Sequence, residues 1–191
     1  MGLANSTKAK LAAAPKKPTA PPLFGSAKAA KRFALWGSYT CPFTAMLVPI
    51  LLQIVRDNPQ RASLEWHHFP THPPDPALHV AGLSFAGTHF WNFTSAVLAI
   101  VNAAGGSFSG LTEPKLLELA VKEGGSRRSL DAAFADRSKW RAVKDDFLAG
   151  QLLGVFKTPG LFVDGYFLTP AGMPMNSKAF DASIRAMLTK S

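Results

Sequence analysis

The side chain with the clearest capacity for chemistry is Cys41, the only cysteine among the 191 residues. A cysteine acts as a nucleophile in its thiolate form. Cys41 stands where an apolar run gives way to residues at helical spacing, so we expect it at the start of a helix. Unpaired backbone N–H groups and the dipole at a helix start favour negative charge. The sequence therefore predicts a reactive thiol, and the alternative is a small buried hydrophobic residue, a common fate of free cysteine.

The five histidines raise the question of a metal site. They are His67, His68, His72, His79 and His89. Their spacing matches no tight ligand pattern, and the two adjacent histidines should point to opposite faces of a strand. Only one cysteine is available as a soft ligand. We therefore expect no metal ion, and structural or surface roles for the histidines.

Three elements are expected to position Cys41. A short apolar run within residues 32–37 ends at Gly37 and predicts a buried strand. From Phe43 onward, apolar residues recur at helical spacing, and this helix should stop before Asn58-Pro59. Residues 62–69 alternate and predict a second strand. The order strand, helix, strand requires a parallel pair with a right-handed crossover.

The rest of the chain predicts helices and then a hairpin. Residues 75–150 are expected to be helical throughout, with a good helix start at Thr112. Asp164-Gly165 lies between two apolar runs, which is the strongest short-range signal of a hairpin. An amphipathic helix follows and should be capped near Asn176 or Ser177. The sequence thus predicts an α/β protein with a mixed sheet.

The N-terminal segment differs in composition from the rest. Residues 1–22 are rich in Ala, Pro, Lys and Thr and lack periodic apolar residues. Residues 1–32 hold seven of the 21 Lys and Arg residues and no acidic residue. This segment therefore carries most of the net charge of +9 of the whole chain. We assign residues 1–24 to a flexible basic tail, and we expect no nucleic-acid partner because such tails are usually solvated.

The single cysteine also bears on the cellular compartment. An intrachain disulfide is impossible, which favours a reducing environment, so we expect a cytoplasmic location, with a periplasmic or secreted one as the alternative. The apolar stretch Leu11–Ala14 is too short for the core of a secretory signal. The longest apolar runs are interrupted by polar residues or proline, so no membrane span is expected.

Several motifs along residues 25–190 resemble those of DsbA-like proteins. They are Cys41-Pro42-Phe43-Thr44 in place of Cys-Pro-x-Cys, the helix proline Pro49, the segments 68–73 and 154–165, and Phe90-Trp91. The resemblance implies a thioredoxin fold with an all-helical insertion. The thioredoxin-like domain would comprise residues 25–73 and 151–191, and the insertion residues 74–150.

The chain departs from this family at Thr44, which replaces the second cysteine of the motif. Dithiol exchange needs a resolving thiol, so the resemblance implies an oxidoreductase that acts through one cysteine. Glutathione could supply the second thiol as a co-substrate, and no other cofactor is expected. Thr44 could point its hydroxyl back at the sulfur of Cys41. Two alternatives stay open: a redox-inactive module that binds a peptide or partner, and a glutathione-dependent transferase or isomerase.

The resemblance also implies a site for thiol- or disulfide-containing proteins and peptides around Cys41. In the family, the residue matched by Pro159 is a cis-proline that faces the cysteine, and the backbone matched by Thr158 pairs with an extended peptide. Tyr39, Pro42 and Phe43 adjoin the cysteine, and we expect Tyr39 and Phe43 to be exposed there. We assign Trp36 and Trp91 to the core.

Overall fold

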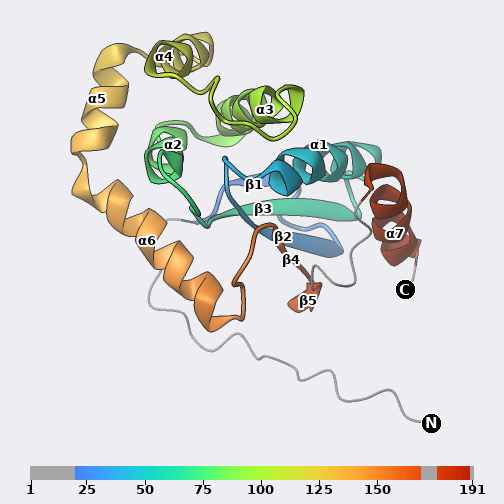
Figure 1. Cartoon of the computed structure of the whole chain (residues 1–191). Helices are drawn as coiled ribbons and strands as arrows, with labels where there is room; N and C mark the ends of the chain where they lie inside the picture. Colours follow the sequence, from blue (N-terminus) through green and yellow to red (C-terminus); the bar gives the residue numbers. More distant parts are fainter. Residues whose placement is uncertain (1–19, 169–175, 190–191) are drawn as a thin grey trace.

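The computed structural model describes residues 20–168 and 176–189 and contains one five-stranded sheet of order β1-β3-β2-β4-β5 (Figure 1). The strands are β1 (Leu23–Gly25), β2 (Lys31–Gly37), β3 (Ala62–His68), β4 (Gly160–Val163) and β5 (Tyr166–Leu168). The helices are α1 (Pro42–Asp57), α2 (Asp75–Gly82), α3 (Gly87–Ala103), α4 (Glu113–Lys122), α5 (Arg127–Ala135), α6 (Arg137–Leu152) and α7 (Ser177–Thr189).

The unit β2–α1–β3 is built as the sequence predicts. Strands β2 and β3 are parallel, with Phe33 opposite Leu64, and α1 connects them. Helix α1 begins at Pro42, where a missing N–H is harmless because the first turn has no intrahelical acceptor for it. It ends at Asp57, immediately before Asn58-Pro59. This connection places Cys41 at the carboxyl end of β2 and the start of α1.

The hairpin is also confirmed. Strands β4 and β5 are antiparallel, and Asp164 and Gly165 between them have φ values of 49° and 82°. Two successive positive φ values are what a type I′ turn requires. Because β4 also pairs antiparallel with β2, the sheet is mixed and the segment before β4 is brought up to Cys41.

One strand was not predicted. Leu23–Gly25 forms β1, which pairs antiparallel with β3, and the carbonyl of Pro22 accepts a hydrogen bond from the amide of Trp66. The boundary of the tail at residue 24 was therefore wrong, because a three-residue edge strand shows too little alternation to be recognised. The prediction that the tail is flexible falls on residues 1–19, outside the described residues.

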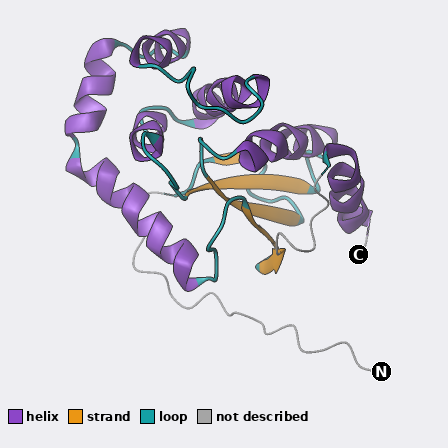
Figure 2. Cartoon of the chain, viewed as in Figure 1, coloured by secondary structure: helices purple, strands orange, loops and turns teal. Residues whose placement is uncertain are grey.

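Both faces of the sheet are covered. In β2, Leu35 belongs to the main core with α1, α3 and α7, while Trp36 points to the opposite face, as alternation in a strand requires. There Trp36 packs with Phe162 and the final turns of α6, including Phe147. Figure 2 shows α1 and α7 along one side of the sheet and α6 running past its end.

The insertion consists of helices α2 to α6, as predicted for residues 75–150. Thr112 caps α4 by accepting a hydrogen bond from the amide of Lys115, and Asn176 caps α7 by accepting one from Ala179. In the described part of the chain, no helix combines the length and apolarity needed to cross a membrane.

Candidate functional site

Cys41 is the residue immediately before α1 and is 8% exposed. Its thiol donates a hydrogen bond to the backbone carbonyl of Thr158, with the sulfur 3.3 Å from the oxygen. This bond uses the protonated thiol. The sulfur accepts no capping hydrogen bond from the α1 amides, so the expected stabilisation at the helix start has no direct hydrogen bond in this conformation.

A groove of about 530 Å³ opens beside the sulfur. Its walls come from the start of α1, the loop after β3, the end of α6 and the segment before β4. The lining residues are Thr40, Cys41, Pro42, Phe43, Phe69, Pro70, Thr71, His72, Phe147, Gln151, Phe156, Lys157 and Thr158. The groove therefore brings together Cys41, Pro42, Phe43 and Thr158 from the predicted site, and Pro159 lies buried next to them.

Two aromatic side chains form an apolar rim. Phe43 is 44% exposed and Phe156 is 75% exposed, and both line the groove. Phe43 was expected to be exposed beside the cysteine, and Phe156 was not singled out from the sequence. The peptide bond between Thr158 and Pro159 is cis.

The exposed role expected for Tyr39 is wrong. Its side chain is completely buried, its hydroxyl lies 2.9 Å from that of Thr94, and its ring packs against Trp66 and His79. Burial is the main reason that the pKa of Tyr39 is raised, and the nearby Asp75 carboxylate raises it further while the Thr94 bond opposes both. Tyr39 precedes Cys41 by only two residues but belongs to the core.

The structure also does not contain the hydrogen bond expected from Thr44 to Cys41. Thr44 is buried and its hydroxyl oxygen has no hydrogen-bond partner in the described structure. Its methyl group instead lies close to Gly37. Thr44 therefore acts here as a packing residue on the inner face of α1, and it places no polar group on the sulfur.

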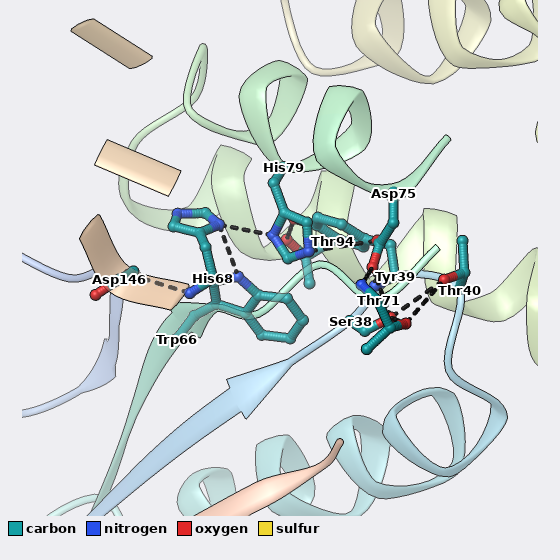
Figure 3. A network of polar contacts seen from close by, with 10 residues as sticks. All are labelled: Ser38, Tyr39, Thr40, Trp66, His68, Thr71, Asp75, His79, Thr94 and Asp146. Atoms are coloured by element: carbon teal, nitrogen blue, oxygen red, sulfur yellow. Dashed lines mark hydrogen bonds and ion pairs between the residues drawn. The ribbon is translucent and has the colours of Figure 1, made fainter. Parts of the chain in front are cut away.

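The loop that carries Cys41 is held by the carboxylate of Asp75, the first residue of α2 (Figure 3). This carboxylate accepts hydrogen bonds from the Ser38 hydroxyl at 2.7 Å, the Tyr39 amide at 2.9 Å and the Thr71 amide at 2.9 Å. Asp75 is fully buried. Burial on its own would raise the pKa of Asp75, but the adjacent His79 and these donors outweigh it, so the pKa lies below its ordinary value.

The bond to Asp75 determines how the neighbouring hydroxyls are oriented. Ser38 has one hydroxyl proton, and it donates this proton to the Asp75 carboxylate, which can only accept. The Ser38 oxygen must therefore accept from Thr71 at 2.9 Å and from Thr40 at 3.2 Å. Thr40 and Thr71 both line the groove. Because their protons point inward, their oxygen lone pairs remain for donors in the groove.

A chain of rings continues from Asp75 into the interior. His79 Nε2 lies 3.3 Å from the Asp75 carboxylate without the geometry of a hydrogen bond, and His79 Nδ1 lies 2.8 Å from His68 Nδ1. The indole N–H of Trp66 also donates to His68 Nδ1, at 3.2 Å. An indole can only donate, so His68 Nδ1 carries no proton and accepts from His79 as well. Burial, and then the neighbouring His79, lower the pKa of His68 to about 3, so the ring is neutral.

The histidines have the structural or surface roles that were expected. His67 stacks on Trp36 and lies 3.1 Å from the Asp146 carboxylate, while His89 pairs with Glu123 near the surface. Among the residues that the structure describes, no group of three or more His, Cys, Asp or Glu side chains is arranged to hold a metal ion.

Sequence reasoning missed Asp75 and Phe156. An acidic residue in the first turn of a helix is ordinarily a surface residue that complements the helix dipole. The only available signal was its place shortly after the proline-rich segment that follows β3. Phe156 stands between Val155, which is buried, and Lys157, and only the direction of the loop decides which of these side chains faces the groove.

Known protein structures share the fold of this chain, although its sequence matches none of the known families. No family model matches the sequence, and no curated protein matches it. Among solved structures, a protein-disulfide isomerase from Novosphingobium aromaticivorans superposes with a TM-score of 0.72 and 17% identity, over 88% of this chain and 97% of that one. A periplasmic thioredoxin-like protein from Salmonella enterica serovar Typhimurium gives 0.71 and 16%, over 89% and 91%. Wolbachia pipientis alpha-DsbA1 gives 0.70 and 16%, over 89% of each chain.

These likenesses define the class of architecture. The chain has a thioredoxin fold with a helical insertion, the arrangement of DsbA-like proteins. At this level of identity the likeness establishes the fold, and the chemistry must be argued from the residues of this chain.

Proposed function

We propose that this protein is a thiol–disulfide exchange protein that acts through Cys41 alone on disulfide-containing peptides or proteins. The observation that carries the proposal is the position of the Cys41 sulfur. It lies at a helix start, in a groove with an apolar rim, and 3.3 Å from the Thr158 carbonyl oxygen. Thioredoxin-fold neighbours that are named as disulfide isomerases or thiol-disulfide exchange proteins support the same chemistry.

The proposed reaction has two exchange steps. The Cys41 thiolate attacks one sulfur of a substrate disulfide, a new S–S bond forms to Cys41, and the other substrate sulfur leaves as a thiolate. A second thiolate then attacks the mixed disulfide. If it attacks the Cys41 sulfur, the first substrate sulfur leaves and Cys41 becomes disulfide-bonded to the attacking thiol. If it attacks the substrate sulfur, Cys41 leaves as the free thiolate.

The second thiol must come from outside the chain, because the sequence has one cysteine. Glutathione is the thiol we propose, acting as a co-substrate. Thr44 stands at the position of the resolving cysteine and offers neither a sulfur nor a hydrogen bond to Cys41.

The groove supports a peptide as the bound molecule. Phe43 and Phe156 present apolar surface to a side chain, and the lone pairs of Thr40 and Thr71 suit backbone N–H donors. A disulfide-bonded peptide that binds in this groove would bring its sulfur up to Cys41, which lines the groove. The partner class is therefore a peptide or protein disulfide.

A redox-inactive binding module is the second candidate, and one observation favours it. Cys41 is 8% exposed and its thiol is engaged with a carbonyl oxygen, an arrangement suited to the unreactive thiol. Such a module would use the same groove and the same aromatic rim without forming a covalent bond.

The cellular compartment decides which thiol is available as the second reactant. The single cysteine predicts a reducing, cytoplasmic environment, and this stays a prediction. The Salmonella neighbour is periplasmic and favours the other compartment. A periplasmic location would make glutathione a less available co-substrate and a partner protein's thiol a more suitable one.

The variant Thr44→Cys tests the proposal. Positions three apart in the first turn of a helix bring Cα atoms within the 4.4–6.8 Å that disulfides need, so the variant should form an internal disulfide. Once reduced, the variant should convert a fluorescent peptide disulfide to its free thiols without added glutathione, because its own two thiols become the internal disulfide, while the wild type should require glutathione as the second thiol. The matched control is Thr44→Ser, which should behave as the wild type. A Thr44→Cys protein that forms its disulfide but never exchanges with the peptide would support the binding module instead.

A further inference from the structure

Thr71, in the loop after β3, is an exposed residue of the Cys41 groove that carries a hydroxyl group. Thr40 lines the same groove but is only 3% exposed. A molecule bound in the groove therefore reaches Thr71 far more readily than Thr40.

Two contacts with the interior fix the direction of the Thr71 hydroxyl. The backbone amide of Thr71 donates to the Asp75 carboxylate at 2.9 Å, and the hydroxyl oxygen lies 2.9 Å from that of Ser38 (Figure 3). Ser38 gives its single proton to Asp75, so the proton of the Ser38–Thr71 contact must come from Thr71. Through Ser38, the Asp75 carboxylate thus prevents Thr71 from donating into the groove.

The Thr71 oxygen keeps its capacity to accept. A hydroxyl oxygen has two lone pairs. Among the side chains that the structure describes, the Thr40 hydroxyl at 3.5 Å is the one placed to donate to this oxygen, and Thr40 has a closer acceptor in Ser38 at 3.2 Å. At least one lone pair is therefore open to solvent or to a bound molecule. A molecule that displaces the solvent without replacing its hydrogen bond loses affinity.

The charge of the groove restricts the kind of donor that fits there. The lining includes Lys157 and no carboxylate. An ammonium or guanidinium group is disfavoured beside this lysine, so the donor should be an uncharged N–H. A peptide backbone supplies such a group at every residue except proline, and hence always close to a substrate cysteine.

We propose that Thr71 is a specificity-determining residue of the Cys41 groove and accepts a hydrogen bond from a backbone N–H that lies next to the cysteine of the substrate. Asp75 is a positioning residue, since it fixes the direction of the Ser38 and Thr71 hydroxyls. The groove should therefore reject substrates with proline or an N-alkylated residue at the position that meets Thr71. The inference rests on the proposed function in placing a peptide in this groove, but it needs no covalent step.

Peptides with a backbone ester test this contact, because an ester replaces one N–H by oxygen with almost no change in shape. The parent is the labelled peptide Ala-Phe-Ser-Phe-Ala, in which serine stands for the cysteine and prevents covalent capture. Each of the three central residues is converted to its ester in turn, and fluorescence anisotropy with the full chain gives the dissociation constants. One ester should bind at least about fivefold more weakly than the parent, which corresponds to about 1 kcal/mol.

Three variants show whether Thr71 causes this loss. Thr71→Val keeps the branched shape and removes the acceptor, so the loss for the same ester should fall below about twofold. Ser38→Ala frees the Thr71 hydroxyl to turn, so the loss should fall below about threefold. Thr88→Val, at an exposed position of α3 outside the groove, is the matched control and should retain the full loss. Because Thr71 is exposed, its variant tests the proposal even if Ser38→Ala fails to fold.

The proposal is overturned if the parent peptide does not bind, if all three esters bind as the parent does, or if Thr71→Val retains the full loss. Full loss in a folded Ser38→Ala protein would overturn the positioning role of Asp75. Failure of the proposed function has a different signature, because Cys41 would then form no mixed disulfide while the difference between parent and ester peptides persists.

Discussion

The two sides of Cys41 are built in opposite ways. On the side of the sheet, Ser38, Tyr39 and Thr40 are buried and tied by hydrogen bonds to Asp75 and the loop after β3. On the side of the groove, Phe43 and Phe156 are 44% and 75% exposed, and their outer surfaces face solvent. We call the buried residues Ser38, Tyr39, Thr40 and Asp75 the floor of the site. Phe43 and Phe156 form its apolar rim.

This difference assigns separate tasks to the two sides. The floor fixes the position of Cys41 relative to the sheet. Because the Asp75 carboxylate of the floor belongs to the helical insertion, the insertion positions the site. The rim contributes little to the folded state and is suited to binding a partner. Changes to the floor should therefore affect stability, and changes to the rim should affect exchange.

The largest effect is expected from Asp75→Asn. Asparagine would carry no negative charge beside His79. Its NH2 group would also face the three donors that now bond to the carboxylate. Breaking such a buried arrangement costs about 3–5 kcal/mol of the free energy of unfolding. Urea denaturation at pH 7 measures this loss. Asp131→Asn, on the exposed face of α5, is the control and should change stability by less than about 0.5 kcal/mol. A loss below about 1 kcal/mol for Asp75→Asn would show that the floor does not depend on this carboxylate.

The second effect concerns pH. The pKa of His68 is lowered to about 3 in the folded state, chiefly by burial and then by His79, while Asp146 and Asp75 act in the opposite direction and His67 adds slightly to the lowering. Because the unfolded chain takes up the proton near pH 6.5, unfolding is favoured as the pH falls from 6.5 towards 3. Between pH 7 and pH 5 the free energy of unfolding should drop by about 2 kcal/mol on account of this residue.

His68→Asn isolates that contribution, because asparagine does not titrate. The variant should be less stable than the wild type at pH 7, and its stability should fall less between pH 7 and pH 5, as measured by urea denaturation at both values. Equal slopes in the two proteins would mean that His68 takes up its proton without unfolding.

The smallest effect on stability is expected at the rim. Phe43→Ala and Phe156→Ala remove side chains that are largely outside the core, so each should change the free energy of unfolding by less than about 0.5 kcal/mol. Each should nevertheless reduce kcat/KM for exchange with an aromatic peptide disulfide by about fivefold, which corresponds to about 1 kcal/mol. Tyr166→Ala, at a half-exposed position on β5 outside the groove, is the matched control and should leave kcat/KM unchanged.

The comparison between floor and rim also shows what a sequence can reveal. Strands β2 to β5, helix α1, the hairpin turn and the caps at Thr112 and Asn176 depend on local patterns, and all were predicted. The floor depends on a contact between Tyr39 and Asp75, residues 36 positions apart, and no local pattern carries it. For the same reason Tyr39 was expected at the surface, although its partners Thr94 and His79 come from the insertion.

The site was predicted in outline from the residues next to Cys41 and from Thr158-Pro159, because a strand end, a helix start and a hairpin must converge in this fold. Details of hydrogen bonding were not predictable. Whether Thr44 turns its hydroxyl or its methyl group inward depends on the space left by Gly37 and Trp66, which only packing defines.

The central claim is that Cys41 forms and exchanges mixed disulfides while the protein is folded. Intact mass after exposure of the native protein to oxidised glutathione tests it most directly, with Cys41→Ser as the matched control. The account predicts one glutathione adduct on the wild type, none on Cys41→Ser, and release of the adduct by a peptide thiol within minutes under native conditions. A wild-type protein that stays unmodified when folded, and reacts only in denaturant, would contradict the account.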